Sequence, residues 1–348
     1  MRIGPVAESL LERVAILLRL GPRPLLETHA TLLLAQSLMV ATKAGVFEAL
    51  ATSPLTAAEV ASRCGTDTSA TSKLLGVLET GYIRATEGGR YALTADARRW
   101  LLRDSAHSLY DNILFRFVEW EWIGRLEGFV RTGTPLDIHA EMSPEQWDLY
   151  QRAMRSLAGV LAREVVLRTP VPRGARAMLD IGGSHGFFSV ALCRRHPALR
   201  AEVLELPGAV ARAAPILARE GLGERVAHRA GDALTEDLGR EAFDLVFVSN
   251  VLHHFEPEQG RDLVRRAARA LRPGGILVIQ ELFALSSGKR AGQVAALADL
   301  YFALTSRSGT RAVEDLAAWQ REAGLRPRRP IRFVSFPGAG QQNAVKPR

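Results

Sequence analysis

The chain has 348 residues, 47% of them hydrophobic, and this length is sufficient for two domains with ordinary buried cores. The most apolar early stretch, residues 30–46, contains Lys43 and is too short to span a bilayer. No signal peptide is recognisable, and Cys64 and Cys193 lie far apart with no partner motif. We therefore expect a cytoplasmic protein with reduced thiols and no membrane contact.

The formal net charge of +8 raises the hypothesis of a nucleic-acid partner. Residues 321–348, however, carry seven basic residues against one acidic residue, a net charge of +6. Most of the excess charge therefore lies in the C-terminal segment. Charge alone does not indicate a polyanion site, and we expect no nucleic-acid partner.

The first hundred residues contain the pattern of a winged helix. A leading amphipathic arm at 5–26 precedes a predicted helix at 27–52 with an apolar stripe. A second helix begins at Thr56, where Glu59 completes a capping box, and ends at Gly65. A third helix, in "DTSATSKLLGVLETG", is followed by the strands "YIRA" and "RYALT" on either side of the turn "TEGG".

The third helix of this domain does not have the composition of a DNA-reading helix. Over residues 68–80 its charged residues are Lys73 and Glu79, and its remaining large residues are leucine and valine. It is therefore predicted to pack against other apolar surfaces. Together with the apolar stripe of the preceding helix, it predicts a homodimer built on this domain.

The rest of the chain divides at "TPVPRGARA" (169–177). Residues 105–165 are predicted to be helical, and their aromatic residues form either core or the wall of a substrate pocket. Strands alternating with helices then predict a doubly wound, mostly parallel sheet. The predicted strands are 177–181, 201–205, 226–229, 243–249, 275–281 and 330–336. The predicted domains are 1–104, 105–170 and 171–348.

A glycine-rich turn follows the first of these strands, in Asp180-Ile-Gly182-Gly183-Ser-His-Gly186. It does not match G-x-G-x-x-G, because serine and phenylalanine stand at the second and third glycine positions, and it lacks the Gly-Lys-Ser/Thr of a P-loop. S-adenosylmethionine carries an ammonium and a carboxylate instead of phosphates. Asp180 is suited to the ammonium, the glycines allow close backbone approach, and the following helix N-terminus favours the carboxylate.

Two more acidic residues follow the next two strands. Glu205, in "VLELP", is placed to accept hydrogen bonds from both ribose hydroxyls, and Asp232, in "AGDAL", from the adenine amino group. Open α/β sheets bind ligands at the carboxyl ends of their strands, where all three acids lie. The sequence therefore predicts S-adenosylmethionine as cofactor, and no cluster with metal-ligand spacing is seen.

The segments "LDIGGSHG", "LELP", "GDAL", "FDLVFVSNVLHHF" and "LRPGGILVIQE" together resemble the S-adenosylmethionine-dependent small-molecule O-methyltransferases. The subfamily has an N-terminal winged-helix dimerisation domain and includes plant caffeate-type and bacterial antibiotic-pathway enzymes. The resemblance covers about residues 27–340. It implies an α/β class I methyltransferase fold, a Rossmann-like doubly wound sheet preceded by an α-helical dimerisation domain. It also implies a homodimer and a small aromatic or polycyclic acceptor.

The motifs and the resemblance together give a set of candidate cofactor-binding residues. These are Asp180, Gly182, Gly183, Gly186, Glu205, Leu206, Asp232, Ala233, Ser249 and Asn250.

The resemblance places the catalytic base at His253, in "NVLHHF". Methyl transfer from a sulfonium is an in-line displacement that needs alignment and a nucleophile able to lose a proton. Histidine is a suitable base, because its ordinary pKa is about 6.5. Adjacent residues on a helix point about 100° apart, so we expect only one of His253 and His254 to face the acceptor.

The sequence departs from the family pattern at three places. Residues 253–255 read His-His-Phe where the family usually has His-Asp-Trp, Ser249 stands where lysine is frequent, and Thr310 stands where a glutamate commonly orients the histidine. Glu281, after the fifth strand, is a candidate to supply the missing carboxylate. O-methylation, C- or N-methylation, cofactor-assisted hydroxylation and ligand sensing by a winged-helix regulator all stay open. The three acids and the apolar third helix favour a methyltransferase.

Overall fold

The computed structural model describes residues 4, 6–7, 9–18, 20–79, 81–284, 292–306, 308–336 and 338–348. Its contacts divide the chain into two compact units, one ending at Glu119 and the other running over Trp120–Arg348. The division falls within helix α8 (Tyr110–Ile123). The domain limits predicted from the sequence, at 104/105 and 170/171, stay predictions.

The N-terminal unit consists of helices and a small sheet in which β1 and β2 both pair with β3. Its elements before α8 are α1 (Leu10–Leu17), α2 (Arg23–Leu25), the π-helix η1 (Leu26–Ala30), α3 (Thr31–Ala44), α4 (Val46–Ala49), β1 (Leu55–Thr56), α5 (Ala57–Cys64), α6 (Thr68–Leu78), β2 (Ile83–Thr86), the 3-10 helix η2 (Glu87–Gly89), β3 (Arg90–Leu93) and α7 (Ala95–Trp100).

Local signals in the sequence explain where these helices begin and end. Thr56 and Glu59 form the predicted capping box of α5, and Gly65 ends that helix in the left-handed conformation at φ 64°. The single helix expected over 27–52 is interrupted, because Gly45 ends α3 at φ 80° before α4 begins. Leu75 of α6 is fully buried, which confirms that this helix packs against the domain core.

The C-terminal unit is a mixed sheet with helices on both faces. Its elements are α9 (Leu126–Thr132), α10 (Ile138–Glu141), α11 (Pro144–Arg168), β4 (Ala177–Ile181), α12 (Phe187–Arg195), β5 (Arg200–Glu205), α13 (Pro207–Ala218), η3 (Gly223–Arg225), β6 (Val226–Ala230), β7 (Phe243–Ser249), η4 (Leu252–His254), α14 (Pro257–Ala270), β8 (Leu271–Ala284), α15 (Gln293–Thr305), β9 (Arg311–Ala312), α16 (Val313–Glu322), β10 (Arg326–Pro327), β11 (Ile331–Arg332) and β12 (Ala339–Val345).

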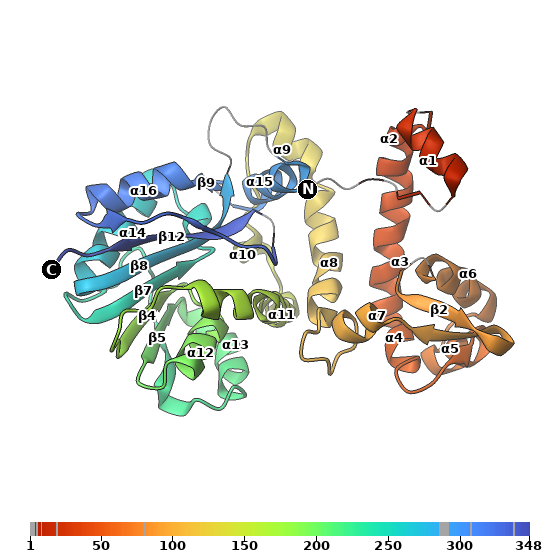
Figure 1. The fold of residues 1–348 in the computed structure, drawn as a ribbon, viewed down its shortest axis with the longest axis horizontal. Helices are drawn as coiled ribbons and strands as arrows, with labels where there is room; N and C mark the ends of the chain where they lie inside the picture. Colours follow the sequence, from red (N-terminus) through yellow and green to blue (C-terminus); the bar gives the residue numbers. More distant parts are fainter. Residues whose placement is uncertain are drawn as a thin grey trace. The chain divides into compact units, whose positions relative to one another are not determined.

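The strand order in this sheet is β10-β12-β8-β7-β4-β5-β6, with β4 to β8 parallel and β12 antiparallel to β8. The chain first moves outward from β4 to β6 and then returns to place β7 on the other side of β4. Helices α12 and α13 cover one face and α14 and α16 the other (Figure 1). The reversal between β4 and β7 is a topological switch point, where open α/β sheets bind ligands at the strands' carboxyl ends.

The final strands differ from the prediction. The segment predicted at 330–336 contributes only the short β11, whereas the main strand is β12. Its central residues, Gln341, Gln342 and Asn343, are each at most 1% exposed. Gln341 Nε2 donates to Thr169 Oγ1 at 2.7 Å and to Gln280 Oε1 at 3.1 Å. A strand whose buried residues are amides lacks the apolar alternation on which the prediction depended.

No helix in the described ranges is both long and apolar enough to cross a membrane.

Candidate active site

The predicted cofactor residues all lie at the carboxyl ends of β4, β5, β6 and β7. Asp180 lies in β4, and the glycine turn joins β4 to α12. Glu205 ends β5, Asp232 follows β6, and Ser249 ends β7. Since these strands are adjacent and parallel, the structure brings the residues to one edge of the sheet, on both sides of the switch point.

The glycine turn is packed tightly against its own chain. A Cβ on Gly182, whose φ is 66°, would lie 2.4 Å from Cγ2 of Val251, on the loop after β7. A Cβ on Gly183 would lie 2.6 Å from Cγ of Asp180 and 2.7 Å from Cγ1 of Val203. The absence of side chains here therefore lets the loops after β4 and β7 meet, in addition to any ligand contact.

Asp180 is a buried carboxyl group with an unused acceptor. Its side chain is 1% exposed, and Ser189 Oγ donates to its Oδ2 at 2.7 Å. Its Oδ1 is buried and has no hydrogen-bond partner among the described residues. Burial raises the pKa of Asp180 to about 7, although the Ser189 bond acts in the opposite direction. An orphaned carboxylate oxygen of this kind fits a cationic group such as an ammonium.

Glu205 and Asp232 occupy more accessible places at the same edge. The Glu205 carboxylate accepts from Ser184 N at 2.9 Å and from its own neighbour Leu206 N at 2.8 Å. Burial raises its pKa. Asp232 is exposed and accepts from Leu234 N at 2.9 Å.

The remaining candidates lie beside these acids. Ala233 is half-buried after Asp232, and Leu206 is half-exposed after β5. Ser249 Oγ accepts from Gln280 Nε2 at 3.0 Å, and Asn250 adopts a φ of 52°. A non-glycine residue in the left-handed region often marks a functional turn, and Asn tolerates it better than most residues.

His253 and Glu281 form a buried pair. Nδ1 of His253 lies 2.9 Å from Oε2 of Glu281, and the side chains are 3% and 2% exposed. Oε1 of Glu281 accepts from the backbone N–H groups of Val251 and Leu252, each at 2.9 Å. The carboxylate therefore accepts a hydrogen bond from Nδ1–H, and the lone pair of the imidazole lies on Nε2. Nε2 of His253 has no hydrogen-bond partner within the described ranges.

His254 lies in the same cluster of rings as His253, and which of the two faces the acceptor stays a prediction. On the 3-10 helix η4 the two ring centroids are 4.2 Å apart, and the His254 ring lies 5.0 Å from that of His139 in α10. Nδ1 of His254 is 3.2 Å from Ser306 Oγ. Burial, with smaller contributions from His253 and His139, lowers the pKa of His254 well below its ordinary value. His254 is therefore a neutral imidazole at physiological pH.

Aromatic side chains complete the surroundings of these histidines. His139 stacks on Trp147 at 5.3 Å between centroids and meets Tyr150 edge-on at 6.1 Å, both from α11. The Phe302 ring of α15 lies 4.3 Å from the His253 ring. Trp147 and Tyr150, which the sequence predicts as either core or pocket wall, thus contact His139, whose ring lies beside that of His254.

Some residues at the site were not predicted. His139 contacts His254 from a distant part of the chain, and a single histidine in a short helix carries no sequence signal of that contact. Thr310, at the position of the family glutamate, bonds through its hydroxyl to Asp299 instead of orienting His253. Glu281 makes that contact, as the sequence suggested.

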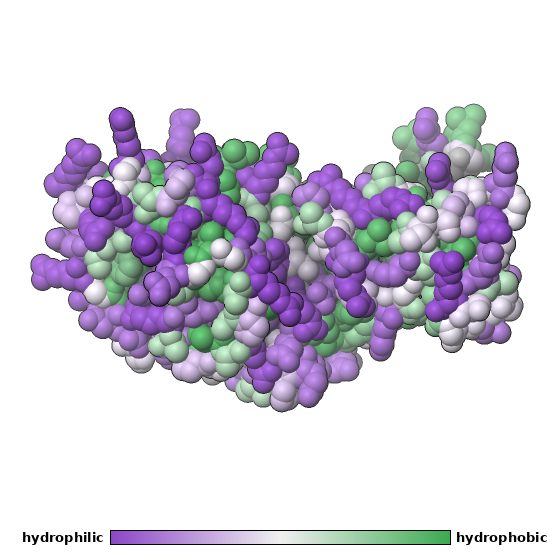
Figure 2. Space-filling model, turned by 90° about the horizontal axis from the view of Figure 1, so that it is seen from below, coloured by the Kyte–Doolittle hydropathy of each residue, from purple (hydrophilic) through white to green (hydrophobic). Residues whose placement is uncertain are grey.

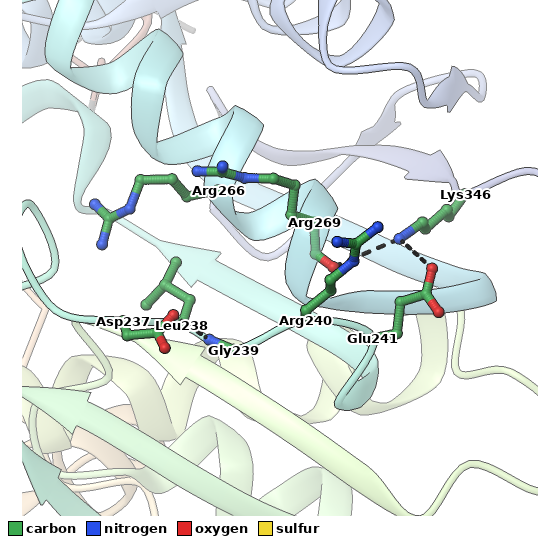
Figure 3. Close-up of a pocket in the computed structure, with 8 residues that line it drawn as sticks. All are labelled: Asp237, Leu238, Gly239, Arg240, Glu241, Arg266, Arg269 and Lys346. Carbon is green, nitrogen blue, oxygen red and sulfur yellow. Dashed lines mark hydrogen bonds and ion pairs between the residues drawn. The ribbon is translucent and has the colours of Figure 1, made fainter.

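A separate cavity of about 430 Å³ lies beside the segment before β7, away from these residues. Figure 3 shows the side chains that line it. Lys346 lies on one side of it, donates to the carbonyl of Leu271 at 2.7 Å and approaches Glu241 at 3.5 Å. Positive charge close to the end of α14 has a structural explanation, because helix C-termini carry free carbonyl groups.

Among the described residues, no group of three or more His, Cys, Asp or Glu side chains could hold a metal ion.

Comparison with known proteins matches both parts of the chain. The family profile of the O-methyltransferase domain matches residues 130–326, and that of the O-methyltransferase dimerisation domain matches residues 26–103.

Relatives and solved structures agree with these profiles. A 3-hydroxy-5-methyl-1-naphthoate 3-O-methyltransferase of Streptomyces sahachiroi is 29% identical over 87% of this chain and 89% of its own. The N,N-dimethyltransferase OxyT of Streptomyces rimosus is 27% identical over 93% and 96%. The structure of human N-acetylserotonin methyltransferase with SAM superposes with a TM-score of 0.83 at 21% identity, covering 99% of this chain and 100% of that one.

The doubly wound sheet with its ligand edge, preceded by the helical dimerisation domain, is a class I methyltransferase fold. The chain belongs to the O-methyltransferase family, the S-adenosylmethionine-dependent family that its motifs resemble. It is therefore an S-adenosylmethionine-dependent methyltransferase.

Proposed function

We propose that this enzyme methylates a hydroxyl group of a small aromatic or polycyclic acceptor in bacterial secondary metabolism. The observation that carries the proposal is the buried pair of His253 and Glu281, because removal of a hydroxyl proton is the step for which O-methylation needs a base. The naphthoate 3-O-methyltransferase of Streptomyces sahachiroi supports the acceptor class. The mitomycin biosynthesis 6-O-methyltransferase of Streptomyces lavendulae, 28% identical over 87% of this chain, supports the pathway type.

The edge formed by β4 to β7 suits the cofactor. In our assignment Asp180 accepts from the ammonium through its free oxygen, and Glu205 accepts from the ribose hydroxyls. Asp232 and Ala233 lie at the adenine, while Leu206, Ser249 and Asn250 border the site. Gly182, Gly183 and Gly186 leave room for the cofactor at the turn. When bound, the cofactor supplies a methyl group on a sulfonium and becomes a neutral thioether.

In the reaction, Nε2 of His253 takes the hydroxyl proton as the acceptor oxygen forms its bond to the methyl carbon. Glu281 holds Nδ1–H, so that the ring keeps the tautomer with a free lone pair on Nε2 and the imidazolium that forms is stabilised by a carboxylate. The rings of His254 and Phe302 lie 4.2 and 4.3 Å from the His253 ring, and this packing leaves little room for water beside the base.

The cofactor assignment can be tested by calorimetry with S-adenosylhomocysteine. We expect one site per chain and at least a roughly tenfold loss of affinity in Glu205→Ala, because hydrogen bonds to a charged group are removed. Glu224→Ala, in the exposed turn η3, is the matched control. Equal affinity in Glu205→Ala and wild type would overturn the ribose assignment.

Methyl transfer to nitrogen or carbon is the second candidate. The relative OxyT is named an N,N-dimethyltransferase, and Thr310 bonds to Asp299 in place of a second carboxylate near His253. Incubation with methyl-labelled cofactor and a panel of phenols, indoles and polyketides, followed by NMR of the product, distinguishes the classes. An O-methyl product supports the proposal, and an N- or C-methyl product overturns it.

We also propose that the enzyme is a homodimer. The O-methyltransferase dimerisation domain at residues 26–103 supports this assembly. Hydrophilic side chains cover much of the face shown in Figure 2. Helix α1, by contrast, is apolar and contains no buried residue. Its Leu10, Leu11 and Leu17 are 78%, 83% and 79% exposed. Such a helix has an apolar face suited to a second copy of the chain.

A further inference from the structure

The glycine turn contains one residue other than glycine whose backbone is in a conformation that favours glycine. Ser184 adopts a φ of 50°, in the left-handed region, where a side chain adds strain. Each of its polar groups is bonded. Its N–H donates to Glu205 Oε2 at 2.9 Å, and its carbonyl accepts from Nε2 of His228 at 2.7 Å. Its hydroxyl donates to Gln151 Oε1 at 2.6 Å.

Gln151 is the residue that ties this turn to helix α11. It lies two turns into that helix, and only 1% of its surface is exposed. The next residue of the turn makes a second attachment. His185 Nδ1 accepts from Phe187 N at 3.1 Å, so its other nitrogen carries the proton and faces the backbone of Met154. The two attachments fall three residues apart on α11, on one face of the helix.

The same helix carries part of the aromatic wall. Trp147 lies one turn before Gln151, and Tyr150 immediately precedes it. Both rings contact His139, which lies 5.0 Å from His254. Hydrogen bonds thus run from the carboxylate of Glu205 through Ser184 to Gln151. Helix α11 then connects Gln151 to the two rings that contact His139, beside His254.

We propose that Gln151 is a positioning residue that holds the cofactor turn through Ser184 and transmits occupancy of the cofactor site to the acceptor wall on α11. The inference rests on the proposed function, in which Glu205 binds the cofactor ribose. When Glu205 engages the ribose, the geometry of Ser184 becomes fixed, and the bond to Gln151 carries that restraint to α11. The enzyme then presents an ordered acceptor wall only after the methyl donor is in place.

The first test is a double-mutant cycle on the affinity for S-adenosylhomocysteine. Gln151→Leu and Ser184→Ala each remove the same hydrogen bond from opposite sides, and each should raise the Kd roughly threefold to tenfold. The double variant should bind no more weakly than either single variant. Ser156→Ala, on the same helix and half-buried, should match wild type.

The second test measures transmission to the wall. The contribution of Trp147 to the fluorescence change on adding S-adenosylhomocysteine is the difference between the wild type and Trp147→Phe. This contribution should be present with Gln151 intact and lost in Gln151→Leu at saturating ligand. If Gln151 were merely structural, its substitution would lower the melting temperature of the free enzyme. It would change neither the affinity for S-adenosylhomocysteine nor the Trp147 contribution to the fluorescence change.

Every outcome of these two tests either supports or overturns the role of Gln151. Unchanged affinity in both single variants, strictly additive losses in the double variant, or a Trp147 signal that survives in Gln151→Leu would overturn the role of Gln151. If Gln151→Leu does not fold, Ser184→Ala removes the same bond and carries both measurements. Failure of the wild type to bind S-adenosylhomocysteine would instead overturn the cofactor assignment, so the two failures are distinguishable.

Discussion

Nδ1 of His253 lies 2.9 Å from Oε2 of Glu281, and both side chains are buried. The two residues come from η4 and β8, adjacent to one another at the carboxyl edge of the sheet. Glu281 also accepts from the backbone of Val251 and Leu252, so one carboxylate fixes both the turn that carries the histidine and the tautomer of its ring.

Glu281→Gln should lower kcat by roughly a hundredfold or more while leaving affinity for S-adenosylhomocysteine unchanged. The amide keeps an oxygen for the two backbone groups but presents an N–H to Nδ1. His253 must then accept at Nδ1 and carry its proton on Nε2, where the acceptor needs a lone pair. Steady-state kinetics checks this, with Glu258→Gln, at an exposed position of α14, as control. Equal rates for the two variants would contradict the role of Glu281.

Asp180 should make the free enzyme less stable as pH rises from about 4 to about 7. In the folded chain burial raises its pKa to about 7, whereas the unfolded chain loses this proton near the ordinary value of about 3.9. Between these values the folded state binds more protons, so the free energy of unfolding falls by up to about 1.4 kcal/mol per pH unit. Above about pH 7 the loss of unfolding free energy caused by Asp180 no longer changes with pH.

Asp180→Asn should remove this slope. Denaturant unfolding of both proteins at pH 5 and pH 7.5 measures it, and the Asn variant should gain stability relative to wild type at the higher pH. Glu205 is present in both proteins, so its own raised pKa cancels in the comparison. Parallel pH profiles for the two proteins would show that Asp180 ionises normally in the fold.

Much of the fold could be predicted from the sequence, because its signals are local. The Thr56 capping box, the Gly65 helix end and the apolar runs of β4 and β7 each depend on neighbouring residues. The amide-rich strand β12 could not be found in this way, because its buried Gln and Asn side chains are satisfied only by distant partners such as Thr169.

The site shows the same contrast. The acids at the strand ends are visible in the sequence as residues that follow apolar runs, and Glu281 is recognisable there as a candidate for the missing carboxylate. The contacts of His139 with His254 and of Gln151 with Ser184 join segments that are 115 and 33 residues apart, as their numbers show (254 − 139 and 184 − 151). Nothing in the local sequence of either member indicates such a contact.

Gly183→Ala should destabilise the enzyme by roughly 1–3 kcal/mol, because the new methyl group would lie 2.6 Å from Asp180 Cγ and 2.7 Å from Val203 Cγ1 in a packed region. Gly208→Ala is the matched control. It lies in α13 with no atom within 4 Å of the new Cβ, and alanine is the better helix former. Urea unfolding of both variants checks the pair. Equal stability would show that the turn has room for a side chain.

Light scattering at micromolar concentration should give a dimer mass of 76.0 kDa, twice the 38.0 kDa of one chain. Leu10→Glu combined with Leu17→Glu should shift the mass toward the monomer, because the change puts charges on the exposed apolar face of α1. Val334→Glu, at an apolar residue 82% exposed in the C-terminal unit, is the control. A wild type that is monomeric would contradict the assembly, and a dimer unaffected by the α1 substitutions would exclude α1 from the interface.

The most direct test of base-catalysed O-methylation is single-turnover methyl transfer against pH for the wild type, His253→Ala and His254→Ala. We predict that His253→Ala lowers the rate by roughly a hundredfold or more and removes the loss of rate toward acidic pH, with cofactor affinity nearly intact. His254→Ala should retain more activity and the wild-type pH profile, because its pKa is already well below its ordinary value. A His253→Ala enzyme that kept most of its rate and its pH profile would contradict base catalysis by His253 and leave alignment alone as the source of catalysis.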